Sequence, residues 1–173
     1  MTGRSEPGEH DPYFGQYIDL AAADDLGDAL GQRPLAALIR DADPALGVRR
    51  YAPGKWTLAG VAQHVLDTER IFAARALRIA RGDDTPLPGF DEVALGDAMP
   101  QDRPLGALAD ELDRVRASTI DLFASLPEAV LLRVGMVSGY ALSARAAGWI
   151  VAGHEAHHAR VVRARYLGGA AER

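Results

Sequence analysis

The stretch SARAAGWIVAGHEAHHARVVRARYL, residues 143–167, decides the fold and carries the most informative side chains. Ser143 can cap a helix by accepting a hydrogen bond from a free amide of the first turn. Three arginines near the other end oppose the negative pole of the helix dipole. Gly168 and Gly169 then supply the residue type that tolerates a left-handed turn at a helix C-terminus. We therefore predict one continuous helix over residues 143–167.

Three of the five histidines of the chain lie in the middle of this predicted helix. His154 and His158 are four residues apart, so their rings project from one face, with roughly 6 Å between their Cβ atoms. This spacing lets two imidazoles reach one metal ion, as in the zinc-binding helices of metalloproteases. His157 could substitute as a ligand, but it lies about 100° around the helix from His158. Helical histidines are more often exposed or singly hydrogen-bonded than metal-bound, so the pair alone does not establish a site.

Length and composition favour one class of fold and exclude several functions. A chain of 173 residues with 48% apolar residues is expected to form one domain with a real core. Only 6% of the residues are aromatic, while alanine and leucine are common, which favours packed helices over a β-sandwich. The formal net charge of −5 argues against a nucleic-acid partner. Cysteine is absent, so a thiolate metal ligand is excluded and any thiol in the chemistry must come from a ligand.

Apolar residues at helical spacing predict three further helices before residue 143. The first covers residues 24–41, where an internal glycine and proline predict a kink or break near residue 33. The second covers residues 57–82 and the third residues 104–127. Residues 82–103 hold three prolines and three glycines and are long enough to return along a bundle. The sequence thus predicts an all-α four-helix bundle with a long crossover loop between its second and third helices.

The remaining segments are predicted to be less regular. Residues 1–16 are polar and rich in turn residues, and we expect an N-terminal arm there, followed by the bundle over residues 17–168 and a tail at 169–173. Residues 128–142 predict a short turn of helix and then a loop, with no convincing strand. No 18-residue apolar run or signal-peptide pattern occurs, so we expect a cytoplasmic protein with no membrane partner.

His64 is the candidate for a third metal ligand. It lies in the middle of the second predicted helix, between apolar residues that draw this part of the helix inward. Alone it could be a buried histidine satisfied by one hydrogen bond. If it meets His154 and His158 at similar depth, the three imidazoles form a site with open coordination positions, the arrangement of catalytic zinc. We expect a divalent ion, zinc first and nickel as the alternative, because ligand affinity favours both over manganese.

Three segments carry a resemblance to a known family. They are YAPGKWTLAGVAQHVLDTERIFAARALRIARGD at 51–83, TPLPGFDE at 85–92 and AGWIVAGHEAHHARVVRARYL at 147–167. Together they resemble the DinB-like family of four-helix-bundle metalloenzymes, over about residues 17–166. The resemblance implies that His64, His154 and His158 hold the metal, and that a long crossover joins the second and third helices.

The resemblance also implies a chemistry. The wider superfamily includes bacillithiol transferases, mycothiol-dependent isomerases and many proteins named for induction after DNA damage. A metal that binds and activates a thiolate is therefore implied, since three neutral histidines leave the ion its full charge to lower the pKa of a bound thiol or water. Two functions stay open. One is transfer of a small-molecule thiol to an electrophile in stress response or detoxification; the other is a non-catalytic protein that binds a metal or small ligand.

Four further residues could support the chemistry around the three histidines. Asp67 lies three residues after His64 and could orient its ring as a hydrogen-bond acceptor, or be a solvated surface carboxylate. His157 could support a ligand in the same way. Tyr17 could close over the metal from the N-terminal arm. Arg75 could bind a substrate carboxylate, but an ion pair with a nearby acidic residue, Glu69 or Asp91, is the alternative we favour.

Assembly is a separate expectation. The first predicted helix, with its internal glycine and proline, leaves apolar surface that two protomers could share. We therefore expect a homodimer. We expect the ligands of the site to be a small-molecule thiol and an electrophile. Both tryptophans, Trp56 and Trp149, are expected to anchor packing.

Overall fold

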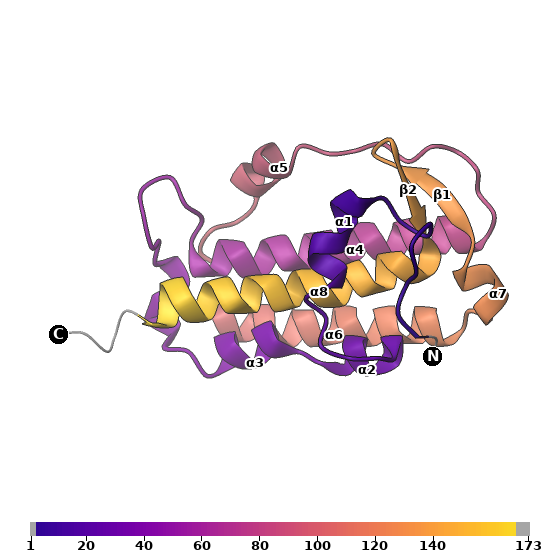
Figure 1. The fold of residues 1–173 in the computed structure, drawn as a ribbon. Coiled ribbons are helices and arrows are strands. Elements are labelled where there is room, and N and C mark those ends of the chain that lie inside the picture. Colours follow the sequence, from indigo (N-terminus) through magenta and orange to yellow (C-terminus); the bar gives the residue numbers. More distant parts are fainter. Residues whose placement is uncertain (1–2, 169–173) are drawn as a thin grey trace.

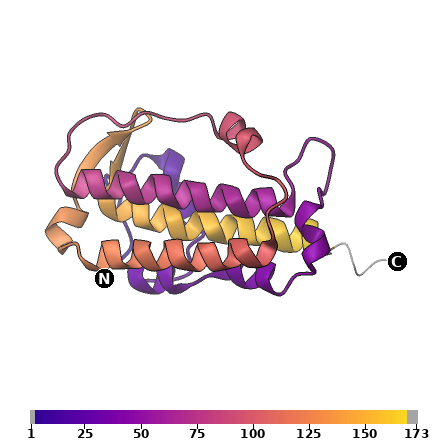
Figure 2. The same cartoon turned by 180° about the vertical axis from the view of Figure 1, so that it is seen from behind.

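Three long helices lie side by side and form most of the bundle (Figures 1 and 2). They are α4 (Leu58–Ala80), α6 (Leu105–Ala124) and α8 (Ala144–Val162). Two short helices, α2 (Leu26–Gly31) and α3 (Pro34–Arg40), follow one another and together take the fourth position. The computed structural model describes residues 3–168. Over these residues the predicted four-helix bundle is confirmed, whereas the predicted tail at 169–173 lies outside them.

Shorter elements connect or cover the four-helix core. They are α1 (Pro12–Ile18), a 3₁₀ helix (Pro44–Val48), α5 (Glu92–Ala98), α7 (Glu128–Leu131), β1 (Val134–Val137), β2 (Tyr140–Ser143) and a π-helical turn (Arg163–Leu167). The helix α1 spans the boundary predicted at residue 16. It does so because Phe14 and Ile18 are buried in the core, so the end of the predicted polar arm packs as part of the fold. Within the described residues, no helix is both long and apolar enough to cross a membrane.

The central helix of the bundle is α8, which packs against α1, α2, α3 and α4. Ser143 caps it as predicted, since its Oγ accepts a hydrogen bond from the amide of Ala146 at 2.9 Å. The helix ends at Val162, and one π-helical turn follows it. Gly168 has a φ of −72°, so it does not adopt the left-handed conformation, and Gly169 lies outside the described residues. Almost every side chain from Ala144 to Glu155 is buried, and this half of the helix therefore lies inside the fold.

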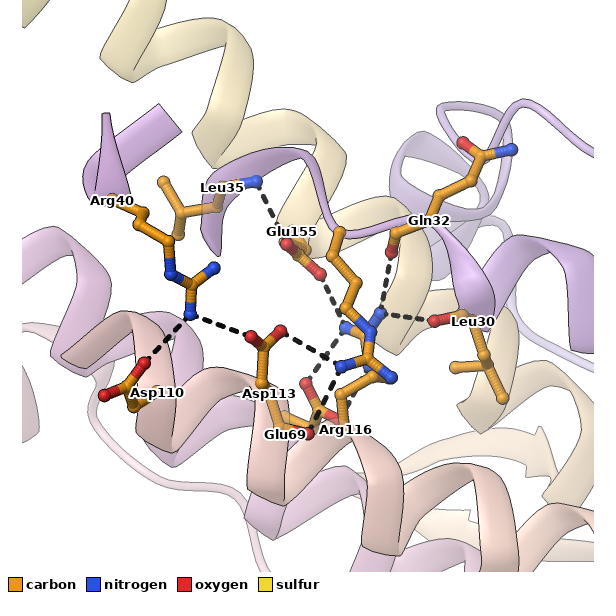
Figure 3. A network of polar contacts seen from close by, with 10 residues as sticks. Leu30, Gln32, Leu35, Arg40, Glu69, Asp110, Asp113, Arg116 and Glu155 are labelled. Carbon is orange, nitrogen blue, oxygen red and sulfur yellow. Dashed lines mark hydrogen bonds and ion pairs between the residues drawn. The ribbon is translucent and has the colours of Figure 1, made fainter. Parts of the chain in front are cut away.

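The break predicted in the first helix is confirmed. Side chains from two other helices form hydrogen bonds with the backbone groups that the break leaves without partners inside a helix (Figure 3). Arg116 on α6 donates hydrogen bonds to the carbonyl oxygens of Leu30 at 2.9 Å and Gln32 at 3.1 Å. Glu155 on α8 accepts one from the amide of Leu35 at 3.0 Å. Helix ends leave such groups without intrahelical partners, and burying them unpaired is unfavourable. The break is therefore held by contacts that are far away in sequence.

The same arginine joins two buried carboxylates. Nε and Nη2 of Arg116 donate to the two carboxylate oxygens of Glu69, each at 2.9 Å, and Nη2 lies 2.7 Å from Oε2 of Glu155. The three side chains meet at this point (Figure 3), and each is 3% exposed or less. Burial raises the pKa of the Glu155 carboxyl, against the lowering effect of Arg116. This buried cluster of Arg116, Glu69 and Glu155 ties α4, α6 and α8 to the break between α2 and α3.

Strands β1 and β2 form an antiparallel hairpin, so the loop predicted at these residues is wrong. Val137 pairs with Tyr140 across a turn of Ser138 and Gly139, whose φ values are 55° and 85°. Positive φ at both central residues is the signature of the type I′ turn that suits two-residue hairpins. Val137 and Leu142 are buried, and they bring the hairpin onto the bundle.

The predicted crossover of residues 82–103 connects α4 to α6 and contains the helix α5. With α1 and the hairpin it lies along one side of the α4 and α8 pair (Figure 1). Gly96 in α5 lies against the indole of Trp56, and a Cβ atom there would be 2.0 Å from that ring. The indole N–H of Trp56 also donates to Asp97 at 3.2 Å. These contacts hold α5 beside the start of α4.

Candidate metal centre

Three histidines from two helices turn their rings toward one another. His64 lies on α4, and His154 and His158 lie on α8. The Nε2 atom of His154 is 3.1 Å from Nε2 of His64 and 3.2 Å from Nε2 of His158. One ring nitrogen of each residue lies within 4.8 Å of those of the other two. The structure thus brings together the three residues chosen from the sequence, and their binding of a metal stays a prediction.

The converging nitrogens fit a metal ion better than they fit one another. A neutral imidazole nitrogen carries either one proton or one lone pair. The Nε2 atom of His154 can therefore form one good hydrogen bond in this cluster, although two nitrogens lie within 3.2 Å of it. Zn–N bonds of roughly 2.0–2.1 Å in a tetrahedral site hold two nitrogens about 3.3 Å apart. His64, His154 and His158 are thus the residues that would hold a divalent ion.

Burial keeps all three rings in the form that binds metals. Loss of solvent lowers the pKa of His64 to about 4 and that of His158 to about 3, and neighbouring imidazoles add to the effect. The pKa of His154 is lowered well below its ordinary value for the same two reasons. All three imidazoles are therefore neutral at pH 7, and binding a metal there displaces no proton from them.

These lowered pKa values predict a pH-dependent stability for the metal-free protein. An unfolded histidine titrates near pH 6.5, so below that pH the unfolded chain binds protons that the native rings exclude. The free energy of unfolding should fall as the pH is lowered from about 6.5 toward 4, by up to about 1.4 kcal/mol per pH unit for each buried ring. Urea titrations at about pH 7, 6 and 5 measure this. The slope should be smaller in His64→Gln, and a flat profile in the unmodified chain would contradict the prediction.

Close packing of α1 on α8 places Tyr17 beside the three histidines. A Cβ atom on Gly153 would lie 1.8 Å from the carbonyl oxygen of Tyr17, so only glycine permits this approach. The Tyr17 ring centroid is then 5.3 Å from that of His154 and 5.9 Å from that of His157. Burial raises the pKa of Tyr17, so its phenol stays protonated at neutral pH. Tyr17 thus lies beside the predicted ligands, and its closing over a metal or contacting a substrate stays a prediction.

The other side of the cluster is bounded by Trp56, whose ring centroid is 5.0 Å from that of His64. The backbone oxygen of Trp56 accepts a hydrogen bond from the Tyr166 hydroxyl at 2.7 Å, which fixes the indole near α8. The sequence analysis assigned Trp56 to packing alone. Its position before the N-cap of the helix that carries His64 is the one signal that could have placed it at the site.

Two residues proposed to support the ligands have other contacts as well. Asp67 accepts a hydrogen bond from the Gln63 amide at 2.9 Å and lies 3.5 Å from the Arg70 guanidinium. Its negative charge still raises the pKa of His64, although the burial that lowers this pKa has the larger effect. The His157 ring centroid lies 4.9 Å from that of His158. Direct orientation of a ligand by Asp67 or His157 stays a prediction.

The ion pair predicted between Arg75 and Glu69 or Asp91 is wrong. Glu69 pairs with Arg116, and the Asp91 carboxylate caps α5 by accepting two backbone amide hydrogen bonds. Arg75 instead donates a hydrogen bond from Nη2 to the carbonyl oxygen of Pro88 at 2.9 Å. Sequence spacing could not identify Arg116 as the partner of Glu69, because the two are 47 residues apart and on different helices.

Two cavities reach the histidines. The first, about 150 Å³, has His154 in its wall and is lined by α1, α4, the crossover, the hairpin and α8. The second, about 460 Å³, has His157 and His158 in its wall, together with Trp56 and Tyr166. The histidines of α8 thus contribute to the walls of two separate cavities.

The DinB superfamily model matches residues 29–162, a span that includes all three histidines. Among solved structures, the chain is similar to YfiT from Bacillus subtilis, described as a probable metal-dependent hydrolase with an unusual four-helix bundle topology. The TM-score is 0.68 at 15% sequence identity, over 94% of this chain and 93% of that chain, a likeness that shows the fold alone. No curated protein matches. Because the family match covers most of its length, the chain belongs to the DinB superfamily.

Proposed function

We propose that this protein is a metal-dependent enzyme that transfers a small-molecule thiol to an electrophile, in a stress or detoxification response. The observation that carries the proposal is the pair of separate cavities, one with His154 and the other with His158 in its wall. A transfer reaction needs two organic reactants at one centre, and this arrangement gives each its own approach. Membership of a superfamily with thiol-dependent enzymes supports the choice of a thiol.

The residues of the chain would divide the work. His64, His154 and His158 would hold a divalent ion, zinc in our proposal and nickel as the alternative. When bound, such an ion keeps its double charge on three neutral imidazoles and lowers the pKa of a thiol at an open position. Tyr17 on α1 lies against the His154 ring, and Trp56, just before α4, lies against the His64 ring. Both would shield the histidine rings from water. The protonated Tyr17 hydroxyl can also donate a hydrogen bond in the first cavity.

Hydrolysis is the second candidate. The similar YfiT structure is described as that of a probable metal-dependent hydrolase, and a metal bound by three histidines also lowers the pKa of water. A hydrolase requires one organic substrate, so only one of the two cavities would be used. A non-catalytic protein that binds a metal or a small ligand is the remaining alternative.

A thiol titration of cobalt-substituted protein tests the proposal. Because the chain has no cysteine, a sulfur-to-cobalt charge-transfer band can come only from the added thiol. We expect this band with bacillithiol, mycothiol or glutathione. Binding should strengthen as the pH rises toward the thiol's own pKa of about 8.5, because the metal competes with the proton.

The controls separate the candidate functions. His10→Ala should keep the band, because His10 lies outside the cluster of ring nitrogens, and His64→Ala should lose it. Turnover of the thiol with a chloro-dinitro arene supports transfer. Metal-bound protein that takes no thiol but hydrolyses esters or amides would favour hydrolysis, and a stable metal site with neither activity would favour the non-catalytic alternative.

A further inference from the structure

Arg75 is a cation that the fold buries without a carboxylate partner. Its side chain is 7% exposed, and within residues 3–168 it forms one hydrogen bond, to Pro88, and no ion pair. Burial lowers the pKa of its guanidinium. A buried charge without a counterion is unfavourable, and buried arginines are normally paired. Arg116 on the neighbouring helix follows that rule with two carboxylates, so the isolation of Arg75 is specific to its position.

Aromatic rings fix the Arg75 guanidinium in place. Its central carbon lies 4.9 Å from the Phe72 ring centroid and 5.3 Å from that of Phe90. Such cation–π contacts stabilise the charge in part, but they supply no oxygen acceptor for its N–H groups. The hydrogen bond to Pro88 uses one of five N–H donors. Donors therefore remain for a ligand in the first cavity, which Arg75 lines.

The first cavity holds a second polar group with unused hydrogen-bonding capacity. Thr68 lines it, and its hydroxyl oxygen is buried with no hydrogen-bond partner within the described residues. Thr68 is four residues after His64, so the two lie on the same face of α4. Arg75 is seven residues further along, and helical side chains lean toward the helix N-terminus. One wall of the cavity thus runs from the metal centre past Thr68 to Arg75.

We propose that the first cavity binds the electrophilic substrate as a monocarboxylate, with its carboxylate on Arg75 and its reacting end toward His154. The inference rests on the proposed transfer function. One guanidinium balances one negative charge and matches a planar carboxylate with two parallel hydrogen bonds. The exposed carboxylate of Glu92 also lines this cavity, which disfavours a doubly charged phosphate.

The remaining walls define the body of the substrate. Apart from Ser138 they are apolar or aromatic, and the rings come from Tyr13, Phe14, Tyr17, Phe72, Phe90 and Tyr140. A cavity of about 150 Å³ accepts a group about the size of a benzene ring. The substrate class is therefore a small aromatic or branched aliphatic carboxylate whose electrophilic carbon lies away from the carboxylate.

Binding of a matched pair of probes tests this site directly. In calorimetric titrations of the metal-loaded protein, benzoate should bind roughly tenfold or more tightly than its neutral analogue benzamide. Arg75→Met should remove this preference. Arg75→Lys should keep part of it, because lysine retains the charge without the planar fork. Arg78→Gln is the matched control, since Arg78 is one turn further along α4, exposed and paired with Asp83, and it should leave the preference unchanged.

Each outcome has a stated meaning. Unchanged benzoate affinity in a folded Arg75→Met variant would overturn the proposal, because the carboxylate would then be bound elsewhere, for example at the metal. Circular dichroism checks the fold of each variant. If Arg75→Met does not fold, the unmodified chain still decides, because equal affinities for benzoate and benzamide contradict the proposal without any variant.

A reaction with matched electrophiles separates this inference from the proposed function. In 4-chloro-3-nitrobenzoate and its carboxamide, the thiolate sulfur forms a bond to the ring carbon, chloride leaves with the bonding electrons, and the thiol proton goes to solvent. We expect kcat/KM, divided for each compound by its rate constant with the free thiol, to be roughly tenfold higher for the carboxylate; this division removes the stronger activation of the ring by the carboxamide. Equal normalised values for both would reject the carboxylate site and keep thiol transfer. A benzoate preference that depends on Arg75, with no transfer to either compound, would keep the site and reject thiol transfer.

Discussion

Replacing His154 with alanine is expected to abolish stoichiometric metal binding and, with it, the proposed thiol chemistry. The Nε2 atom of His154 is within 3.2 Å of both other converging nitrogens, so its loss leaves two ligands from different helices. Changes in residues that merely support metal ligands already weaken binding by about 10–100-fold, and loss of a ligand should exceed that. Elemental analysis of untagged protein after dialysis measures the result.

Two other histidines serve as controls for this experiment. His10→Ala should retain a full equivalent of metal, because His10 is not among the three clustered residues. His157→Ala should retain most of it, with a modest loss of affinity if His157 supports His158. Full metal content in His154→Ala would show that the assignment of His154 as a ligand is wrong. Because removal of a buried ring can alter packing, His154→Gln provides a variant of similar size.

Replacement of Arg116 by methionine should lower the free energy of unfolding by about 3–5 kcal/mol, because it leaves the carboxylates of Glu69 and Glu155 buried without a cation. The backbone oxygens at the break between α2 and α3 lose their donor in the same substitution. Urea unfolding followed by circular dichroism gives the value.

Comparison with a surface ion pair makes this prediction specific. Arg33 pairs with Asp113 at 3.0 Å, but both side chains are about one-third exposed, so Arg33→Met should have only a small effect. Combining Arg116→Met with Glu69→Leu and Glu155→Leu should recover much of the lost stability, because no charge then remains buried. Equal losses in Arg116→Met and Arg33→Met would show that the buried cluster contributes nothing beyond a surface pair.

The sequence predicted those features that depend on local pattern. Apolar spacing placed the long helices, and Pro34 after Gly31 marked the break in the first one. His64 could be matched with the pair on α8 because apolar neighbours drew it inward, and the resemblance to a known family supported the match. These signals act over one or two helical turns, so they are visible in the chain itself.

Features that depend on distant contacts could not be predicted in this way. The partner of Glu69 is set by the packing of α4 on α6, and several arginines were equally available in the sequence. The hairpin has a Ser-Gly turn, a weaker signal than Asn-Gly, and its strands are only four residues long. The cavity beside Arg75 is built from five separate segments, so no single stretch contains it.

The crossover of residues 82–103 gives this fold a way to change its chemistry during evolution. The histidines lie on two long helices, whereas Pro88, Phe90 and α5 contact Arg75 or Trp56 from a connection outside the four-helix core. Insertions and substitutions in such a connection leave the core intact, since surface connections tolerate them far better than packed helices do. Related chains could therefore keep the three histidines and accept different small molecules by altering residues 82–103 alone.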